Sequence, residues 1–260
     1  MLADYSTLRP TAAELRAAEI TAVGRYIGWD SVPGYSSIGK NLSRAEAVTL
    51  TGAGIGIFLA FEYAANAAAS GAAQGVADGT LATVQLAELG APDGMTVYFA
   101  CDWDVPDYAP AALDTPANAA AKLGPVAAYF RGIGRAAAYT VGVYGGYYVC
   151  KRVLDAGLAS MAWQTAAWSG GQRDPRAVIY QTGQTTLGSA DVDVHETTSP
   201  DFGQWPRPGS PATQEAHVTI TSPPPGNWEG PVIVAGKGTD GNLYVTKTAD
   251  GKTWTEPARQ

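Results

Sequence analysis

Charged side chains are scarce in this chain. Aspartate, glutamate, lysine and arginine make up 16% of its 260 residues, and the formal net charge is −7. Because no run of lysine or arginine could neutralise a phosphate backbone, we exclude nucleic acid as a partner. Hydrophobic residues make up 46% of the chain, which suffices for a large folded core and excludes a mostly disordered protein.

Cysteine and histidine are also rare, which excludes several kinds of site. The two cysteines, Cys101 and Cys150, cannot form a disulfide framework, and we expect both to be buried free thiols. The two histidines, His195 and His217, are too few for a His/Cys metal cluster, and no HExxH motif occurs. We therefore expect no metal and no cofactor. The G-x-S-x-G elbow of serine hydrolases is absent as well.

Long apolar runs are missing too. No stretch approaches the ~20 unbroken apolar residues of a membrane-spanning helix, so we expect no membrane partner. The N-terminal segment MLADYSTLRP lacks the basic and apolar regions of a secretory signal. We therefore expect a virion protein or an extracellular protein released by a non-classical route, and otherwise a cytoplasmic protein.

Short apolar runs alternate with alanine-rich helical stretches through most of the chain. The runs that we interpret as strands are residues 2–5, 22–29, 56–62, 96–102, 138–144, 161–166, 177–181 and 190–194. Most lack apolar–polar alternation, as is typical of strands buried on both faces. Capping boxes at residues 11–14 and 43–46 predict two helix starts. The pattern predicts an α/β fold, an irregular (β/α)8 TIM-like barrel, because the last two connections are too short for full helices.

The composition changes after residue 197. We predict a barrel over residues 1–197, a proline-rich linker or arm over 198–227, and a small β module over 228–260 with strands at 232–236 and 243–247. Within the module, TADGKTWTEP resembles the Asp-box hairpin of sialidase-type propellers. One sheet this small cannot bury its own apolar face. The module therefore either docks on the barrel or assembles with other chains. We favour assembly, as a homo-oligomer or with other virion proteins.

Carboxylates stand at the ends of several predicted strands. They are Asp4, Glu62, Asp102, Asp104, Asp191 and Asp193. In a parallel barrel the carboxyl ends of all strands open on one face, so we predict that these acids converge there. Two residues apart in an extended chain, Asp102 and Asp104 would point the same way, about 6 to 7 Å apart. One of the pair would then have a raised pKa and donate a proton, as glycoside hydrolysis requires.

Aromatic and amide side chains near the strand ends indicate a carbohydrate ligand. The aromatic candidates are Tyr26, Trp29, Tyr63, Trp103, Tyr144, Trp163 and Trp168. Sugar rings stack on such side chains, although each of them could equally be a packing residue. Gln164 and Gln181 could hydrogen-bond sugar hydroxyls or N-acetyl groups, and Asp191 could join them in substrate binding.

The ordered segments ADYS, VGRYIGW, GIGIFLAFEY, VYFACDWDV, VGVYGGYYVC, MAWQT and ADVDVHE resemble a known family. It is the glycoside-hydrolase-like DUF1906 family of actinobacterial proteins and their phages, which is related to the family 25 lysozymes. The resemblance covers roughly residues 1–197 and implies an irregular barrel that faces peptidoglycan-like glycans. It also implies that Asp4, Asp102, Asp104 and Asp193 are site acids and that Tyr144 and Gln181 line the cleft.

One position departs from the lysozyme pattern. The lysozymes place a glutamate where this chain has Asp104, whose carboxyl is one methylene shorter, and Glu62 could be the compensating acid. The sequence therefore leaves two hypotheses open. The first is a muramidase-like enzyme that cleaves cell-wall glycan. The second is a non-catalytic structural or glycan-binding component of a phage tail or capsid surface.

Overall fold

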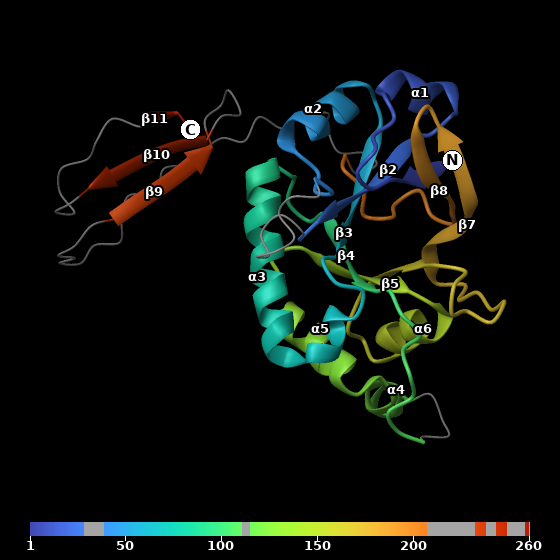
Figure 1. Ribbon diagram of the computed structural model, residues 1–260. Helices are drawn as coiled ribbons and strands as arrows, with labels where there is room; N and C mark the ends of the chain where they lie inside the picture. The colour runs from blue at the N-terminus through green and yellow to red at the C-terminus, as the bar shows by residue number, and fades with distance from the viewer. Residues whose placement is uncertain (29–38, 111–114, 207–231, 238–242, 249–257, 260) are drawn as a thin grey trace. The chain divides into compact units, whose positions relative to one another are not determined.

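The computed structural model describes residues 1–28, 39–110, 115–206, 232–237, 243–248 and 258–259 (Figure 1). The chain divides into two compact units, Met1–Gly209 and Ser210–Gln260, which we describe separately. Trp29, most of the proline-rich arm and the Asp-box turn lie outside the described residues.

Eight strands of the first unit form a closed barrel, which confirms the predicted α/β barrel fold. They are β1 (Leu2–Asp4), β2 (Ala22–Ile27), β3 (Gly56–Phe61), β4 (Thr96–Cys101), β5 (Thr140–Gly145), β6 (Met161–Gln164), β7 (Ala177–Leu187) and β8 (Ala190–Thr197). Neighbours from β1 to β7 are parallel, but β8 is antiparallel to both β7 and β1. The prediction that all strands point the same way is therefore wrong for β8. Only Gly188 and Ser189 separate β7 from β8, and such a turn can join antiparallel strands only.

Helices cover the outside of the barrel (Figure 1). They are α1 (Ala12–Ala17), α2 (Arg44–Gly52), the 3-10 helix η2 (Ala67–Ser70), α3 (Ala72–Leu89), α4 (Pro116–Leu123), α5 (Pro125–Ala136) and α6 (Tyr147–Asp155). Both predicted capping positions are confirmed, because the Thr11 and Ser43 side chains accept bonds from the amides of Glu14 and Glu46. None of the described helices is long and apolar enough to cross a membrane.

The inside of the barrel has an apolar layer and, towards the carboxyl ends of most strands, a polar one. The buried apolar cluster contains Leu2, Ala22, Phe58, Ala60, Tyr98, Trp163, Ile179 and Phe202. Because side chains alternate along a strand, the next inward positions after Leu2 and Ala60 are Asp4 and Glu62. Cys101 and Cys150 are buried free thiols, as predicted. Side-chain alternation along the strands therefore places Asp4 and Glu62 in a polar layer next to the apolar layer.

Residues 198–206, the start of the segment expected to be a linker or an arm, pack against the barrel. The Tyr98 hydroxyl donates to the Phe202 carbonyl at 2.7 Å, and Trp205 exchanges backbone hydrogen bonds of 2.7 and 2.8 Å with Ile57. Phe202 is 6% exposed and completes the apolar layer. The compact unit therefore extends to Gly209, beyond the predicted boundary at residue 197.

The second unit contains a small antiparallel sheet in the order β11–β10–β9. Its strands are β9 (Val232–Lys237), β10 (Leu243–Thr248) and β11 (Ala258–Arg259). The two strands expected in this region are confirmed. The expected oligomerisation through this module stays a prediction.

Candidate active site

Asp4 is the most firmly held carboxylate at the mouth of the barrel. The Tyr26 hydroxyl donates to Asp4 Oδ1 at 2.7 Å, and His195 Nε2 lies 2.8 Å from Asp4 Oδ2. Asp4 and His195 are 5% and 1% exposed. Gly24 permits this arrangement, because a Cβ there would lie 2.7 Å from the Asp4 Cβ. Both carboxylate oxygens of Asp4 are therefore fixed in place.

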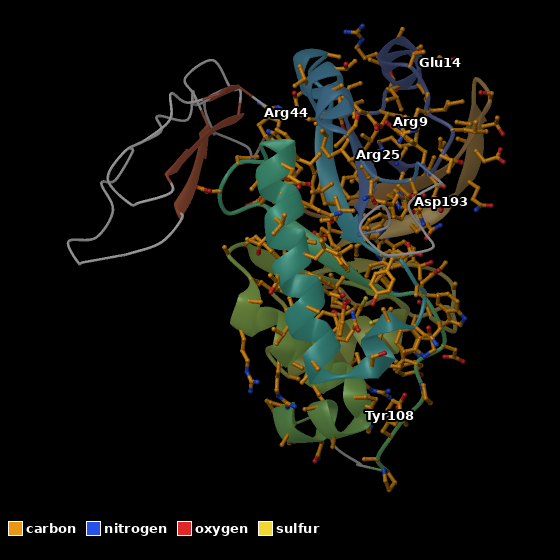
Figure 2. The ribbon with its side chains drawn as sticks, turned by 60° about the vertical axis from the view of Figure 1, so that its left-hand side comes forward. Arg9, Glu14, Arg25, Arg44, Tyr108 and Asp193 are labelled. Atoms are coloured by element: carbon orange, nitrogen blue, oxygen red, sulfur yellow. The ribbon has the colours of Figure 1, made fainter. Side chains whose placement is uncertain are left out.

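Glu62 and Asp102 lie just past the carboxyl ends of β3 and β4. The Glu62 amide donates to the Ile27 carbonyl at 3.1 Å, and the Asp102 amide donates to the Ala65 carbonyl at 3.0 Å. These backbone bonds hold both residues beside the barrel mouth. Asp193 reaches the same mouth from β8, where it pairs with Asp4 in the antiparallel register (Figure 2).

A lysine enters this group of acids. Lys40 Nζ lies 3.3 Å from Glu62 Oε2 and 3.9 Å from the centroid of the Tyr26 ring. The side chains of Lys40 and Glu62 are only 13% and 14% exposed, so solvent screens their ion pair weakly. The contact with Tyr26 adds a cation–π interaction. Lys40 therefore supplies positive charge at the mouth.

Burial raises the pKa of Glu62, Asp102 and Asp193. The Lys40 charge opposes this effect at Glu62 and Asp102. Neighbouring carboxylates raise these pKa values further. The charges of Asp102 and Asp4 raise the pKa of Glu62, and those of Asp4 and Asp193 raise the pKa of Asp102. For Asp193, Asp4 raises the pKa further, whereas hydrogen bonds from Gln184 and Gln181 and the charge of His195 lower it. Such mutual influence requires that the four acids lie close together.

Asp104 and Asp191 are exposed, unlike the four acids of this cluster. Strand β4 ends at Cys101, so the two-residue alternation that predicted a paired Asp102 and Asp104 does not extend to them. Asp104 is exposed, and the charges that act on Asp102 are those of Lys40, Asp4 and Asp193. Asp191 is exposed on the β7–β8 hairpin and accepts a bond from the Thr186 hydroxyl at 3.2 Å. The geometric basis for an Asp102–Asp104 pair is therefore lost, and the pair itself stays a prediction.

The predicted sugar-binding residues divide into two groups. Tyr144 and Gln181 are partly buried at the mouth: burial raises the pKa of Tyr144, as do Asp102 and Asp4, and Gln181 bonds to Asp193. Gln164 is fully buried, and its amide bonds the Gln172 carbonyl at 2.8 Å and the Asp174 amide at 2.9 Å. Its role is to hold the β6–β7 loop, because these loop bonds occupy both ends of its amide.

Two residues of the mouth, Lys40 and His195, were not predicted. His195 could have been found, since it lies two positions beyond Asp193 on the same strand and therefore on the same face. Lys40 lies outside every helix and strand, so no periodicity indicates it. Trp163, expected as a possible stacking surface, is 1% exposed and belongs to the apolar layer.

A buried arginine, Arg25 of β2, is labelled in Figure 2 and lies beside the mouth. Because side chains alternate along a strand and its neighbours Gly24 and Tyr26 face Asp4, Arg25 points away from the barrel interior. The Arg25 side chain is 0% exposed, and its Nε donates to Glu46 Oε1 at 2.7 Å. The same guanidinium donates to two backbone carbonyls. One belongs to Tyr5, which follows Asp4 in the chain, and the other belongs to Lys40, the lysine of the mouth. Arg9 Nε also donates to Glu46, at 2.8 Å. The network thus fixes the backbone of two mouth segments.

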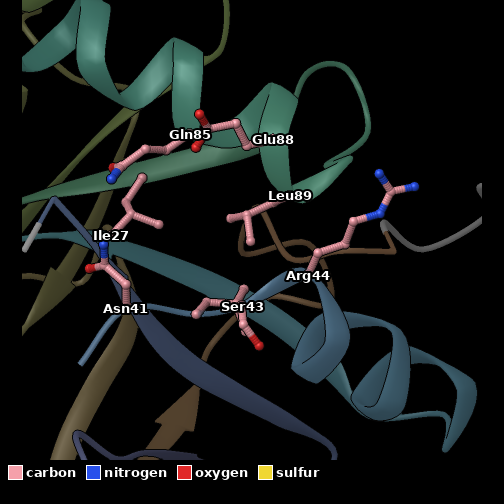
Figure 3. Close-up of a pocket in the computed structure, with 8 residues that line it drawn as sticks. Ile27, Asn41, Ser43, Arg44, Gln85, Glu88 and Leu89 are labelled. Carbon is pink, nitrogen blue, oxygen red and sulfur yellow. The ribbon is translucent and has the colours of Figure 1, made fainter. Parts of the chain in front are cut away.

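A separate pocket of about 340 Å³ lies on the outer surface, between the end of α3 and the start of α2 (Figure 3). It is lined by Ile27, Asn41, Leu42, Ser43, Arg44, Gln85, Glu88 and Leu89. None of the mouth carboxyls is among them, so this pocket is distinct from the acid cluster. Within the described part of the chain, no three His, Cys, Asp or Glu side chains form a group suited to hold a metal ion.

A closed eight-stranded barrel with carboxyls at one mouth is an architecture found among glycoside hydrolases. The chain belongs to the Rv2525c-like, glycoside hydrolase-like domain family, whose family model matches residues 13–199. This membership confirms the resemblance to the glycoside-hydrolase-like family.

Three comparisons with Mycobacterium tuberculosis proteins describe what the chain is similar to. The chain is 26% identical over 212 residues to the Mycobacterium tuberculosis protein named "Putative peptidoglycan hydrolase Rv2525c". The alignment covers 78% of this chain and 83% of that protein. The crystal structure of the Tat-secreted M. tuberculosis protein Rv2525c in complex with HEPES has a TM-score of 0.67 and 27% identity, over 78% of this chain and 98% of that one. The complex with L-tartrate has a TM-score of 0.65 and 26% identity over the same shares.

Proposed function

We propose that this protein hydrolyses glycosidic bonds in the glycan strands of bacterial peptidoglycan, as a muramidase-like enzyme. The observation that carries the proposal is the convergence of Asp4, Glu62, Asp102 and Asp193 at one mouth, with raised pKa values at the last three. Glycoside hydrolysis requires a protonated carboxyl beside ionised ones, and clustered, partly buried acids supply both. The peptidoglycan-related name of the mycobacterial relative supports the choice of substrate.

The geometry favours a division of roles among the acids. The ion pair with Lys40 at 3.3 Å favours an ionised Glu62, which leaves Asp102 as the proton donor to the glycosidic oxygen. Asp4 is fixed by Tyr26 and His195 and stabilises the positive charge that develops on the sugar. Asp193 and the carboxylate of Glu62 add to the negative electrostatic potential that stabilises this positive charge. We place Asp104 outside this mechanism because its side chain is exposed.

We further propose that the protein acts outside the cell, where peptidoglycan is accessible. The support is that the mycobacterial relative is a Tat-secreted protein. The alternative, a non-catalytic component of a phage particle, stays a prediction: neither the comparisons nor the described residues favour it.

The test is the release of reducing ends and muropeptides from purified actinobacterial cell walls. We expect activity from the full chain, and a loss of about 100-fold or more in Asp102→Asn, the size of a typical general-acid contribution. Asp4→Asn should also lose most activity. Asp104→Asn should keep most activity, and a large loss there would return Asp104 to the site. No release by the wild-type protein would contradict the proposed reaction.

A further inference from the structure

Trp168 in the β6–β7 loop combines exposure with an unusual backbone conformation. Its side chain is 38% exposed, and its φ is 55°. A bulky residue rarely adopts a positive φ, and it does so only where the surrounding structure imposes that conformation. The fold therefore stabilises an arrangement in which a large indole faces solvent.

The loop is held from beneath by buried polar groups. The Ser169 hydroxyl donates to the Thr165 carbonyl at 2.6 Å and accepts a bond from the Tyr147 amide at 2.9 Å. Gln164 Nε2 bonds the same hydroxyl at 3.2 Å and the Gln172 carbonyl at 2.8 Å. Since Tyr147 begins α6, these bonds tie the Trp168 turn to that helix. Ordering the indole on a ligand would therefore have a small entropic cost.

Polar and aromatic groups lie near Trp168. The Trp168 Cβ lies against Gly146, where an added Cβ would be 3.0 Å away. Tyr148, two residues after Gly146, is 43% exposed, and its hydroxyl accepts a hydrogen bond of 2.7 Å from the side-chain amide of Gln172. The Arg152 guanidinium carbon lies 5.1 Å from the centroid of the Tyr148 ring. A pyranose ring has an apolar face bordered by hydroxyls, so it matches a surface of aromatic faces beside hydrogen-bonding groups.

This surface lies at the same end of the barrel as the acid mouth. Strand β5 ends at Gly145 and β6 ends at Gln164, so the start of α6 and the Trp168 turn both lie at the carboxyl end of the barrel. Tyr144, which faces the acids, immediately precedes Gly145 in the chain. A glycan strand bound across the mouth would therefore have neighbouring sugars at this edge.

We propose that Trp168 and Tyr148 form a sugar-binding platform on the rim, where one pyranose ring of a β-1,4-linked N-acetylated glycan stacks beside the catalytic acids. The choice of a glycan as occupant rests on the proposed function. The platform would position a sugar that is not itself cleaved.

The test is a titration of the full chain, labelled with 15N at its seven tryptophans, with a hexamer of N-acetylglucosamine. The missing indole N–H resonance in Trp168→Phe identifies Trp168. We expect a saturable shift of that resonance, and an affinity reduced about threefold to tenfold in Trp168→Ala. The control Val48→Ala changes a side chain that is 62% exposed on α2 and should bind as the wild type does. Alanine at position 168 retains a non-glycine residue at the same φ, and thermal unfolding checks that both variants fold.

The outcomes separate this proposal from the proposed reaction. If the Trp168 resonance shifts but cell walls release no reducing ends, the platform stands and the hydrolysis proposal fails. If walls are cleaved while the Trp168 resonance and the affinity of Trp168→Ala stay unchanged, the platform is wrong. It is equally overturned if only other indole resonances move, or if no hexamer binds.

Discussion

The Arg25–Glu46 pair allows a quantitative test of how the barrel supports its mouth. In Glu46→Gln the fully buried Arg25 guanidinium loses its counter-charge, while an amide oxygen still occupies the acceptor position. Breaking a buried ion pair by removing one partner costs about 3 to 5 kcal/mol of the free energy of unfolding. Arg25 keeps bonds to the Tyr5 and Lys40 carbonyls and lies 4.3 Å from the Tyr5 ring centroid, so the lower end applies.

For a domain of this size, a loss of about 3 kcal/mol lowers Tm by about 6 to 12 °C. Urea denaturation and thermal unfolding of the full chain measure both quantities. The control Glu88→Gln makes the same change at an exposed position and should shift the free energy of unfolding by less than about 0.5 kcal/mol. A loss below about 1 kcal/mol in Glu46→Gln would refute the reasoning, because the network would then contribute no more than a surface ion pair.

The same pair predicts a pH dependence. Burial raises the pKa of Glu46, but the charges of Arg25 and Arg9 and their hydrogen bonds outweigh this and hold it below its usual value. Its contribution to stability is therefore complete above the pKa of Glu46 in the unfolded chain and is lost as the pH falls through the lower folded-state pKa. The difference between wild type and Glu46→Gln should narrow on acidification, and a constant difference would contradict the assignment.

Three further predictions concern the mouth, the helix packing and the apolar layer. Lys40→Met should raise the pKa of Glu62 further, because the charge that lowers this pKa is lost. A 13C NMR titration of the Glu62 carboxyl measures the change, with Lys40→Arg as the control that keeps the charge. An unchanged titration in Lys40→Met would argue against the ion pair. Gly75→Ala should destabilise the protein by about 1 to 3 kcal/mol or more, since its Cβ would lie 2.0 Å from the Tyr129 carbonyl oxygen. Gly134→Ala in α5, with nothing within 4 Å, should instead stabilise it by about 0.5 to 1 kcal/mol in denaturant titrations, and equal effects would exclude close α3–α5 packing as the cause. Phe202→Ala should cost about 3 to 5 kcal/mol in the same assay, and a neutral result would mean that residues 198–206 do not complete the core.

The strands and helix starts were predictable because their signals are local. Each of the eight apolar runs overlaps a strand, and Thr11 and Ser43 cap the helices that their spacing to Glu14 and Glu46 indicates. Strand ends were less well defined. The predicted fourth strand extended to Asp102, one residue beyond the observed end at Cys101, so strand alternation no longer supports pairing Asp102 with Asp104. A period of two residues has no meaning once the chain leaves the strand.

The mouth itself was predictable in part. Asp4, Glu62, Asp102 and Asp193 could be grouped because each stands near the end of an apolar run or within the last one. Lys40 and His195 were missed, and Gln164 was misassigned, because their roles depend on contacts with residues distant in the sequence. The same holds for residues 198–206, whose proline-rich composition resembles a linker although Phe202 is buried in the barrel.

The sequence by itself determined the barrel class, the order of its strands and the acidic character of one end, because these follow from run length, alternation and residue type. Only the tertiary structure decided which acids meet. Barrel closure places Asp193 of the antiparallel β8 opposite Asp4, and it brings Lys40 to Glu62 and His195 to Asp4. The pKa of a carboxyl depends on burial and on charges within a few ångströms, and those distances are set by closure rather than by sequence spacing.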